Sequence, residues 1–153
     1  MHARSGGDFL TPAERSERMA RVRGKHTAPE LIVRRLLHGM GYRYRLHRRE
    51  LPGSPDIVFP SRKKSIFVHG CFWHRHAGCR LTTMPRTHAD FWQAKFASNI
   101  ARDRRNVKAL EELGWIALVV WQCETRESYM LAGQFRAFLD GTGQGDGRSG
   151  TPQ

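Results

Sequence analysis

The first apolar pattern that repeats along the chain has helical spacing. Between residues 31 and 40, Leu, Val and Met side chains recur three or four positions apart, and Gly41 follows them. Thr27 is a candidate N-cap, Pro29 lies in the first turn, and Glu30 is placed to complete a capping box. A helix is therefore predicted from about Thr27 to Met40.

Strands are predicted where apolar residues alternate with charged ones or form short unbroken runs. Residues 42–46 alternate large apolar and charged side chains, as a half-buried strand does. Residues 56–59 and 65–68 are short apolar runs on either side of a charged turn at 61–64. Residues 115–121 are apolar throughout, which is typical of a central strand covered on both faces.

Further helices complete the predicted order of elements. A short basic helix is expected over residues 13–23, a long one from Thr87 to about Leu113, and a closing one over 127–139. The order α-β-β-β-α-β-α predicts an α/β fold with a central mixed sheet flanked by helices. The predicted organisation is a flexible N-terminal arm, one domain and a disordered tail rich in Gly, Ser, Thr and Gln, at residues 1–12, 13–139 and 140–153.

Charge points to a polyanionic partner. Lys and Arg number 26 against 14 Asp and Glu, so the net charge is +12, and nucleic acid is the commonest partner of such a domain. A membrane surface is the rival, but no apolar stretch is long enough to span a bilayer. The polar N-terminus lacks the apolar segment of a secretory signal, so a reducing, cytoplasmic setting is expected. In that setting, cysteines are interpreted as metal ligands or buried thiols before disulfides.

The segment from residue 69 to 79 is dense in metal-binding side chains. It contains three His and two Cys, and tetrahedral zinc takes four such ligands at short loop spacing. Cys71, His76 and Cys79 are candidates, and the fold could return Cys123 as the fourth. His69 or His74 could replace His76, and the alternative is a loop with incidental histidines and buried thiols. Four protein ligands would leave no open position, so this zinc is predicted to be structural.

Asp56 and His74 are the candidates for phosphodiester chemistry. Asp56 begins a strand after a turn, and Mg²⁺ is bound by one or two carboxylates together with phosphate oxygens. The alternative is an Asp that only caps the turn. An unperturbed imidazole can exchange a proton near neutral pH, so His74 could take a proton from water, unless it is one more ligand of the metal site. Glu30 is either a helix cap or part of the same site.

Several apolar side chains could touch DNA. Phe72 and Trp73 lie in a polar loop, where exposed rings suit stacking on bases or wedging between base pairs. Trp92 lies on the apolar face of its helix and could equally be core. Met19 is either a packing residue or an apolar probe on a basic arm.

Ordered motifs across most of the chain resemble one family. They are Lys25–Glu30, Leu51–Asp56, Phe67–His74, Phe91–Lys95 with Asn99, Arg102–Arg105, Leu113–Trp115 and Val120–Cys123. In this order they resemble the very-short-patch repair (Vsr) endonucleases, from about residue 15 to 139. The run His-Gly-Cys-Phe-Trp-His followed by Cys is the most specific of them.

The resemblance implies a restriction-endonuclease-like fold and a nick 5′ to the thymine of a T:G mismatch, which arises when 5-methylcytosine deaminates. It implies that Asp56 and the main-chain carbonyl of Val68 bind Mg²⁺ and that His74 activates water. Glu30 and His69 would support the metal-bound waters. The remaining implied roles are structural zinc on Cys71, His76, Cys79 and Cys123, and DNA contact by Phe72, Trp73, Trp92 and Met19. Double-stranded DNA with a T:G mismatch is the expected partner of a bacterial, nucleoid-associated monomer, together with other mismatch-repair proteins.

Two features depart from better-known members. Val68 stands where they carry Thr, which is compatible with a ligand that uses only the main-chain carbonyl. One extra residue separates His76 from Cys79, so Ala77 and Gly78 must loop out if Cys79 is to remain a ligand. The main rival interpretation is a zinc-stabilised DNA-binding module without catalysis, and a second is a nuclease that processes RNA.

Overall fold

The computed structural model describes Thr11 and residues 26–141. Its elements are α2 (Ala28–Gly39), β1 (Arg45–Leu46), β2 (Ile57–Phe59), the 3₁₀ turn η1 (Pro60–Arg62), β3 (Lys64–His69), α3 (Cys71–His74), α4 (Ala89–Glu112), β4 (Ile116–Trp121), the 3₁₀ turn η2 (Gln122–Arg126) and α5 (Ser128–Asp140). The predicted arm apart from Thr11, the basic helix over 13–23 with Met19, and the tail from residue 142 lie outside the described residues.

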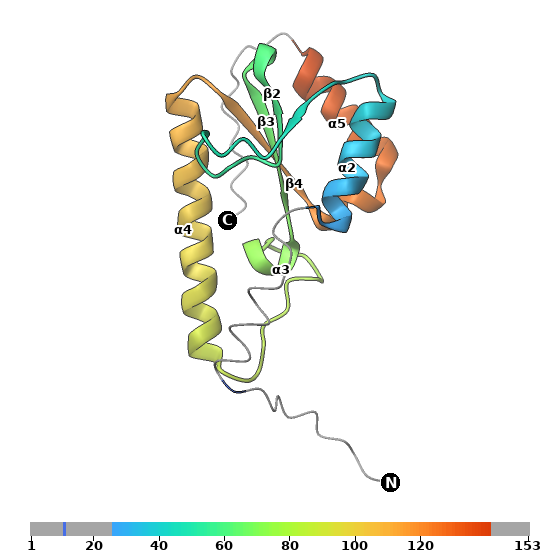
Figure 1. Cartoon of the computed structure of the whole chain (residues 1–153). Coiled ribbons are helices and arrows are strands. Elements are labelled where there is room, and N and C mark those ends of the chain that lie inside the picture. Colours follow the sequence, from blue (N-terminus) through green and yellow to red (C-terminus); the bar gives the residue numbers. More distant parts are fainter. Residues whose placement is uncertain (1–10, 12–25, 142–153) are drawn as a thin grey trace.

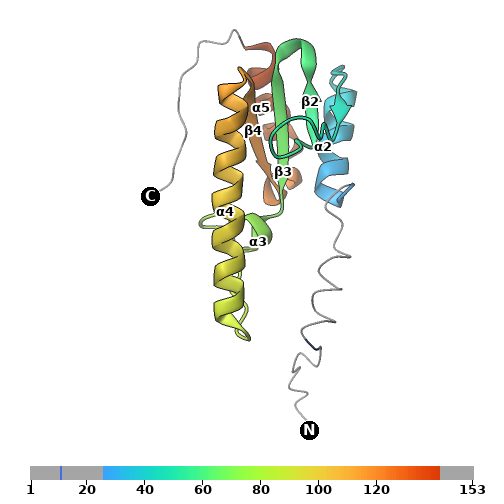
Figure 2. The ribbon, with the colours of Figure 1, turned by 60° about the vertical axis from the view of Figure 1, so that its left-hand side comes forward.

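The four strands form one mixed sheet in the order β1-β2-β3-β4. β1 pairs with β2 and β2 with β3 in antiparallel fashion, whereas β3 and β4 are parallel. Helix α4 covers one face of the sheet, and α2 and α5 cover the other (Figure 1, Figure 2). The predicted α/β fold with a mixed sheet between helices is therefore confirmed.

The prediction that residues 115–121 form a central strand is wrong. Among the described strands β4 pairs with β3 alone, so it is an edge strand of the sheet. Only Val120 of β4 is buried, and the first residue, Ile116, is exposed. The run is apolar because helices lie over both faces of this edge (Figure 1).

The main core lies between the sheet and the α2–α5 layer. Its buried side chains come from α2, the three longer strands and α5, with Tyr42 at the margin: Val33, Leu37, Tyr42, Ile57, Phe59, Ile66, Val120, Leu131, Phe135 and Leu139. A smaller buried set on α4, Phe96, Asn99 and Leu110, faces the other side. Burial of this apolar surface is the dominant favourable contribution to folding.

Local chemistry sets the ends of the helices. Thr27 accepts a hydrogen bond from the Glu30 amide at 3.4 Å, as the predicted N-cap requires. Gly41 has φ of +94° and lets the chain turn after α2, so that the Tyr42 amide reaches the Leu37 carbonyl. Helix α4 begins at Ala89, two residues after the predicted start, because His88 adopts a left-handed conformation.

Two connections bring side chains to one edge of the sheet. The predicted loop 69–86 contains the four-residue helix α3, which follows β3 directly and ends at His74. The loop before β2 passes close to α4. At Gly53, where φ is +75°, a Cβ would lie 2.9 Å from the Asn106 side chain, so only glycine permits this approach.

Candidate active site

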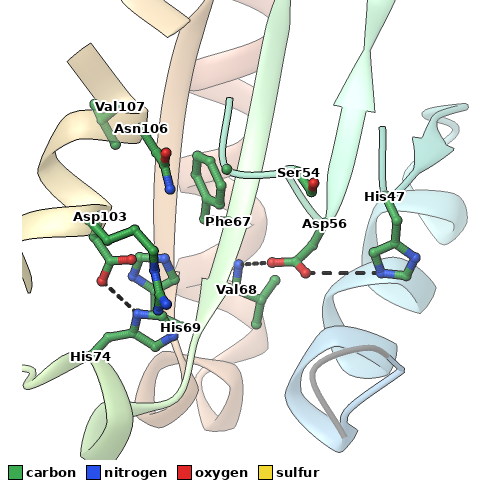
Figure 3. A pocket seen from close by; sticks show the side chains of 12 residues that line it. His47, Ser54, Asp56, Phe67, Val68, His69, His74, Asp103, Asn106 and Val107 are labelled. Carbon is green, nitrogen blue, oxygen red and sulfur yellow. Dashed lines mark hydrogen bonds and ion pairs between the residues drawn. The ribbon is translucent and has the colours of Figure 1, made fainter. Parts of the chain in front are cut away.

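A cavity of about 370 Å³ opens where the start of β2, the end of β3, α3 and α4 meet (Figure 3). Polar and charged groups gather at it from elements far apart in the sequence. The lining residues are His47, Gly53, Ser54, Asp56, Phe67, Val68, His69, His74, Arg102, Asp103, Asn106 and Val107. Asp56 and His74, the two residues on which the predicted chemistry depends, therefore face the same space.

Asp56 lies at the cavity because it directly precedes β2. The β2–β3 pairing places it beside the end of β3, where its Oδ2 accepts a hydrogen bond from the Val68 amide at 2.8 Å. Its Oδ1 lies 4.0 Å from Nε2 of His47 (Figure 3). The structure thus brings together Asp56 and the main chain of Val68, the two predicted Mg²⁺ ligands.

Burial raises the pKa of Asp56 to about 7. The nearby charge of Glu30 contributes to this rise, whereas the hydrogen bond from the Val68 amide opposes it. A carboxyl group held in this way binds a proton near neutral pH. A divalent cation would compete with that proton, which is the behaviour expected of a metal ligand.

Glu30 performs two tasks. Its Oε2 accepts a hydrogen bond from the His26 amide at 2.8 Å, next to the helix start, while Oε1 lies 2.6 Å from Nε2 of His47. The side chain is only 2% exposed. Although burial acts to raise its pKa, the hydrogen bonds from His47, Asp56 and His26 lower it below its usual value. The two interpretations of Glu30, a cap and a member of the site, are compatible in geometry.

His74 is held in two directions. Its Nδ1 lies 2.6 Å from Oδ2 of Asp103, and its ring stacks on His69 with 3.9 Å between centroids and 7° between planes (Figure 3). Burial opposes ionisation of Asp103, but the hydrogen bond from His74 and nearby positive charges lower its pKa. The Asp103 bond occupies Nδ1 of His74, so Nε2 is the nitrogen that can accept a proton from water.

His69 differs from its stacking partner. It is buried at the end of β3, and this burial, together with the charges of His74 and Arg102, lowers its pKa to about 3. A neutral imidazole can donate or accept a hydrogen bond but cannot supply a positive charge near pH 7. This fits the supporting role predicted for His69.

Two residues of the site were missed by sequence reasoning. His47 follows β1 and lies between Glu30 and Asp56, and Asp103 lies within α4. The one available signal for Asp103 was an isolated acid within Arg102-Asp-Arg-Arg105, a run otherwise made of arginines. His47 gave no comparable signal, since its role depends on the pairing of β1 with β2.

The predicted cysteine and histidine ligands form a separate cluster. One ligand atom from each of Cys71, His76, Cys79 and Cys123 lies within 4.8 Å of the others. Nδ1 of His76 is 3.7 Å from Sγ of Cys71 and 3.4 Å from Sγ of Cys123. Ligands of a tetrahedral zinc ion stand roughly 3.3–3.8 Å apart, so this cluster has the size and chemistry for zinc.

The structure accommodates the unusual spacing in this cluster. Ala77 and Gly78 are exposed, and Gly78 has φ of +72°, so the extra residue loops outward and Cys79 still reaches the cluster. His69 and His74 do not belong to it. They lie instead with Asp103 in a second group of potential ligands.

The aromatic side chains form a third group beside the cavity. Phe72 contacts Trp73 and Trp92 with ring centroids 5.1 Å and 5.7 Å apart, and Trp92 packs on buried Phe96. Phe72, Trp73 and Trp92 are all partly buried, so the rings of Phe72 and Trp73 are less exposed than their polar loop suggested. Packing on α4 supplies the burial that the isolated loop sequence lacks.

Comparison with known proteins agrees with this arrangement. Residues 7–80 match the sequence model of the family described as DNA mismatch endonuclease Vsr. The type II nicking enzyme V.XorIIP of Xanthomonas oryzae pv. oryzae is 52% identical over 133 residues, which cover 87% of this chain and 97% of that protein. This chain belongs to the Vsr family of DNA mismatch endonucleases. The Vsr assignment agrees with the restriction-endonuclease-like fold.

Two further Vsr relatives extend the comparison. DNA mismatch endonuclease Vsr of Escherichia coli is 43% identical over 119 residues, covering 78% of this chain and 76% of that protein. The type II nicking enzyme V.NmeAIP of Neisseria meningitidis is 40% identical over 119 residues, covering 78% and 84%. This Vsr-family chain is therefore a DNA endonuclease. None of its described helices is long and apolar enough to cross a membrane.

Proposed function

We propose that this Vsr-family enzyme nicks one strand of duplex DNA 5′ to the thymine of a T:G mismatch, in very-short-patch repair of deaminated 5-methylcytosine. One observation carries the proposal. His47 and Asp56, which lie in one cluster with buried Glu30, line the same cavity as the His74–Asp103 pair, in a member of a mismatch-endonuclease family. Such a cavity has room for a phosphodiester between a cation site and a base.

Asp56 and the main-chain carbonyl of Val68 would hold Mg²⁺. Carboxylate and carbonyl oxygens are the ligands that this hard cation prefers, and the raised pKa of Asp56 marks a carboxyl that gains from a nearby positive charge. The bound cation would polarise the phosphoryl group and stabilise the leaving oxygen. Glu30 and His69 would hold the water molecules around it.

His74 would act as the general base. Its Nε2 takes a proton from the attacking water, while Asp103 holds the opposite nitrogen and stabilises the resulting imidazolium. Arg102 also lines the cavity and would offset the negative charge of the phosphate. Asp103 on α4 thus orients the ring of His74 on α3 and supplies the negative charge that stabilises its protonated form.

Cys71, His76, Cys79 and Cys123 would hold a structural zinc ion. With all four positions taken by protein, this site has no room for substrate. Its role would be to fasten the segment after β3 to the segment after β4, since Cys71 and Cys123 follow those two strands. Loss of the ion would loosen α3, which carries His74.

DNA recognition would combine charge with aromatic insertion. Phe72, Trp73 and Trp92 would enter the stack beside the mismatch, with Met19 wedging from the minor groove. A mismatched pair unstacks at lower cost than a matched one. We expect a monomer, because the proposed site lies within one chain. We expect it to act with other mismatch-repair proteins at the bacterial nucleoid, in the cytoplasm.

A nicking assay on defined duplexes tests the proposal. Labelled T:G, T:A and C:G duplexes of one sequence are incubated with the full chain and Mg²⁺, and the products are sized on a denaturing gel. The expected result is one cut 5′ to the mismatched thymine by the parent, and none by Asp56→Ala. Asp90→Ala, which removes an exposed acid of α4, is the matched control and should cut as the parent does.

Other outcomes separate the rival functions. Tight binding of the T:G duplex without any cut would support the zinc-stabilised binding module. Cleavage of RNA hairpins at the same rate as T:G DNA would support an RNA-processing nuclease. Equal cutting of matched and mismatched DNA would contradict mismatch specificity while leaving the endonuclease activity in place.

A further inference from the structure

A row of four aromatic rings connects the active site to the Cys/His cluster. His74 stacks on His69 at 3.9 Å, and His69 meets the edge of Trp121 at 5.4 Å with 75° between planes. Trp121 in turn stacks on His76 with 4.3 Å between centroids and 7° between planes. The first ring belongs to the proposed base and the last to a proposed zinc ligand, and His69 would hold water molecules around the cation. Trp121 is the one member of the row to which the proposed function gives no role.

The sheet fixes the middle of this row. His69 and Trp121 are paired at the last position of the parallel β3–β4 ladder, so the backbone holds their side chains next to each other. Two residues beyond them, Cys71 and Cys123 enter the cluster, and the Cys123 amide donates a hydrogen bond to the Cys71 sulfur at 3.4 Å. Each strand therefore gives one ring to the row and one thiol to the cluster.

The row of rings restricts the orientation of the His74 ring plane, which the bond to Asp103 alone does not. The bond to Asp103 holds one nitrogen, but the ring can still rotate about the line of that bond. The parallel stack on buried His69 restricts the ring plane, and Trp121 supports His69 at its edge. A misdirected Nε2 would leave the attacking water without a well-placed acceptor.

We propose that Trp121 is a positioning residue that couples the Cys/His cluster to His74. It touches neither substrate nor cation, and its effect passes through His69. The inference rests on the proposed role of His74 as the base. It implies that the metal cluster does more than hold the fold, because its order reaches the catalytic ring through Trp121.

Substitution of Trp121 separates positioning from stability. Trp121→Leu removes the flat ring, and Trp121→Phe keeps a smaller one. Trp115→Leu, at the residue just before β4, is the matched control. Each full-length variant is assayed for bound zinc per chain, affinity for a T:G duplex with Ca²⁺ in place of Mg²⁺, and single-turnover nicking with Mg²⁺. We expect Trp121→Leu to keep its zinc and its duplex affinity while its nicking rate falls about 10- to 100-fold.

The remaining variants define the result. Trp121→Phe should recover most of the nicking rate, and Trp115→Leu should nick within about 3-fold of the parent, as expected for a change away from the site. Unchanged nicking by Trp121→Leu would overturn the proposal. A rate that falls only in proportion to lost zinc would also overturn it, because that result indicates a purely structural residue.

A second measurement keeps the test decisive if Trp121→Leu does not fold. NMR spectra of histidine ring protons in the parent and Trp121→Phe need no substrate. The resonances of His69 and His74 should shift in the variant, whereas exposed His38 on α2 should not change. Unshifted His74 resonances would contradict the coupling. Because these spectra do not involve nicking, they remain informative even if the T:G reaction itself is not observed.

Discussion

Asp103 lies 2.6 Å from Nδ1 of His74, although the two residues come from different helices and were not linked by any sequence pattern. Replacement of Asp103 by Asn keeps the shape but lets the amide donate to Nδ1, which favours the wrong tautomer of the base. We expect Asp103→Asn to lower the single-turnover nicking rate by about 100-fold or more. Affinity for the T:G duplex, measured with Ca²⁺, should stay within a few-fold of the parent. A variant that nicks normally would remove Asp103 from the mechanism.

Asp56 is predicted to limit stability in the absence of divalent cations. Its pKa in the folded protein is about 7 against an ordinary 3.8, so between these values the folded chain binds more protons than the unfolded one. The free energy of unfolding therefore falls as the pH rises through this window. Asp56→Asn should be more stable than the parent at pH 8, by on the order of 2 kcal/mol, with little difference near about pH 4.

Thermal melts in Mg²⁺-free buffer at several pH values measure this difference. Asp90→Asn on the exposed start of α4 is the control and should show no comparable gain. A destabilised Asp56→Asn at pH 8 would show that the carboxylate is favourable in the folded protein. Such a trade of stability for activity is common where a charged group is buried for function.

His47 is predicted to hold the carboxyl groups of Glu30 and Asp56 in position relative to each other. Its Nε2 lies 2.6 Å from Glu30 and 4.0 Å from Asp56, so His47→Ala leaves the buried Glu30 without this partner. We expect a loss of about 1–3 kcal/mol in the free energy of unfolding and a higher Mg²⁺ concentration for half-maximal nicking. His47→Gln, whose amide can still donate, should restore most of both. Equal defects in the Ala and Gln variants would argue for a ring-specific role instead.

The Cys/His cluster is predicted to be required for folding at ordinary temperature. Cys71 is fully buried, whereas Cys79 lies on the outer side of the cluster beside an exposed loop. Cys71→Ser should lose bound zinc and several kcal/mol of stability, about the scale of a lost structural metal. Cys79→Ser should retain weaker zinc binding. Metal analysis and thermal melts of the purified chains measure both, and normal stability without zinc would contradict the assignment.

Trp73 tests the aromatic contact with DNA. It is partly buried against Phe72 and Trp92, so its ring is already ordered before DNA binds. Trp73→Ala should weaken binding of the T:G duplex by about 1–3 kcal/mol, the scale of one base–aromatic stack. Binding of a matched duplex should change less. Equal losses on both duplexes would assign Trp73 to general packing.

Elements with strong local signals were predicted well, and relations across the fold were not. Thr27 and Gly41 mark the ends of α2 by their own chemistry, and the candidate metal ligands Cys71, His76 and Cys79 are close in sequence. The return of Cys123 needed only the idea that β4 ends near β3. These predictions depended on short-range rules that a single sequence contains.

The missed features depend on tertiary pairing. The edge position of β4 follows from the sheet order, which an apolar run does not reveal, since helices can lie over both faces of an edge strand as well as of a central one. Phe72 and Trp73 seemed exposed because the loop alone offered no packing, whereas α4 supplies it. His47 and Asp103 become site residues only when β1 and α4 are placed beside Asp56 and His74.

Helix α4 carries both Trp92 and Asp103, about 16 Å apart along its axis. No break interrupts the helix between these positions. Trp92, which would contact the bases, and Asp103, which holds the proposed general base His74, therefore move together as one rigid element. The helix thus fixes the distance between the proposed site of base contact and the proposed site of strand cleavage. A change in the distance between the probed base pair and the cut phosphate would therefore have to come from outside α4, for example from bending of the DNA.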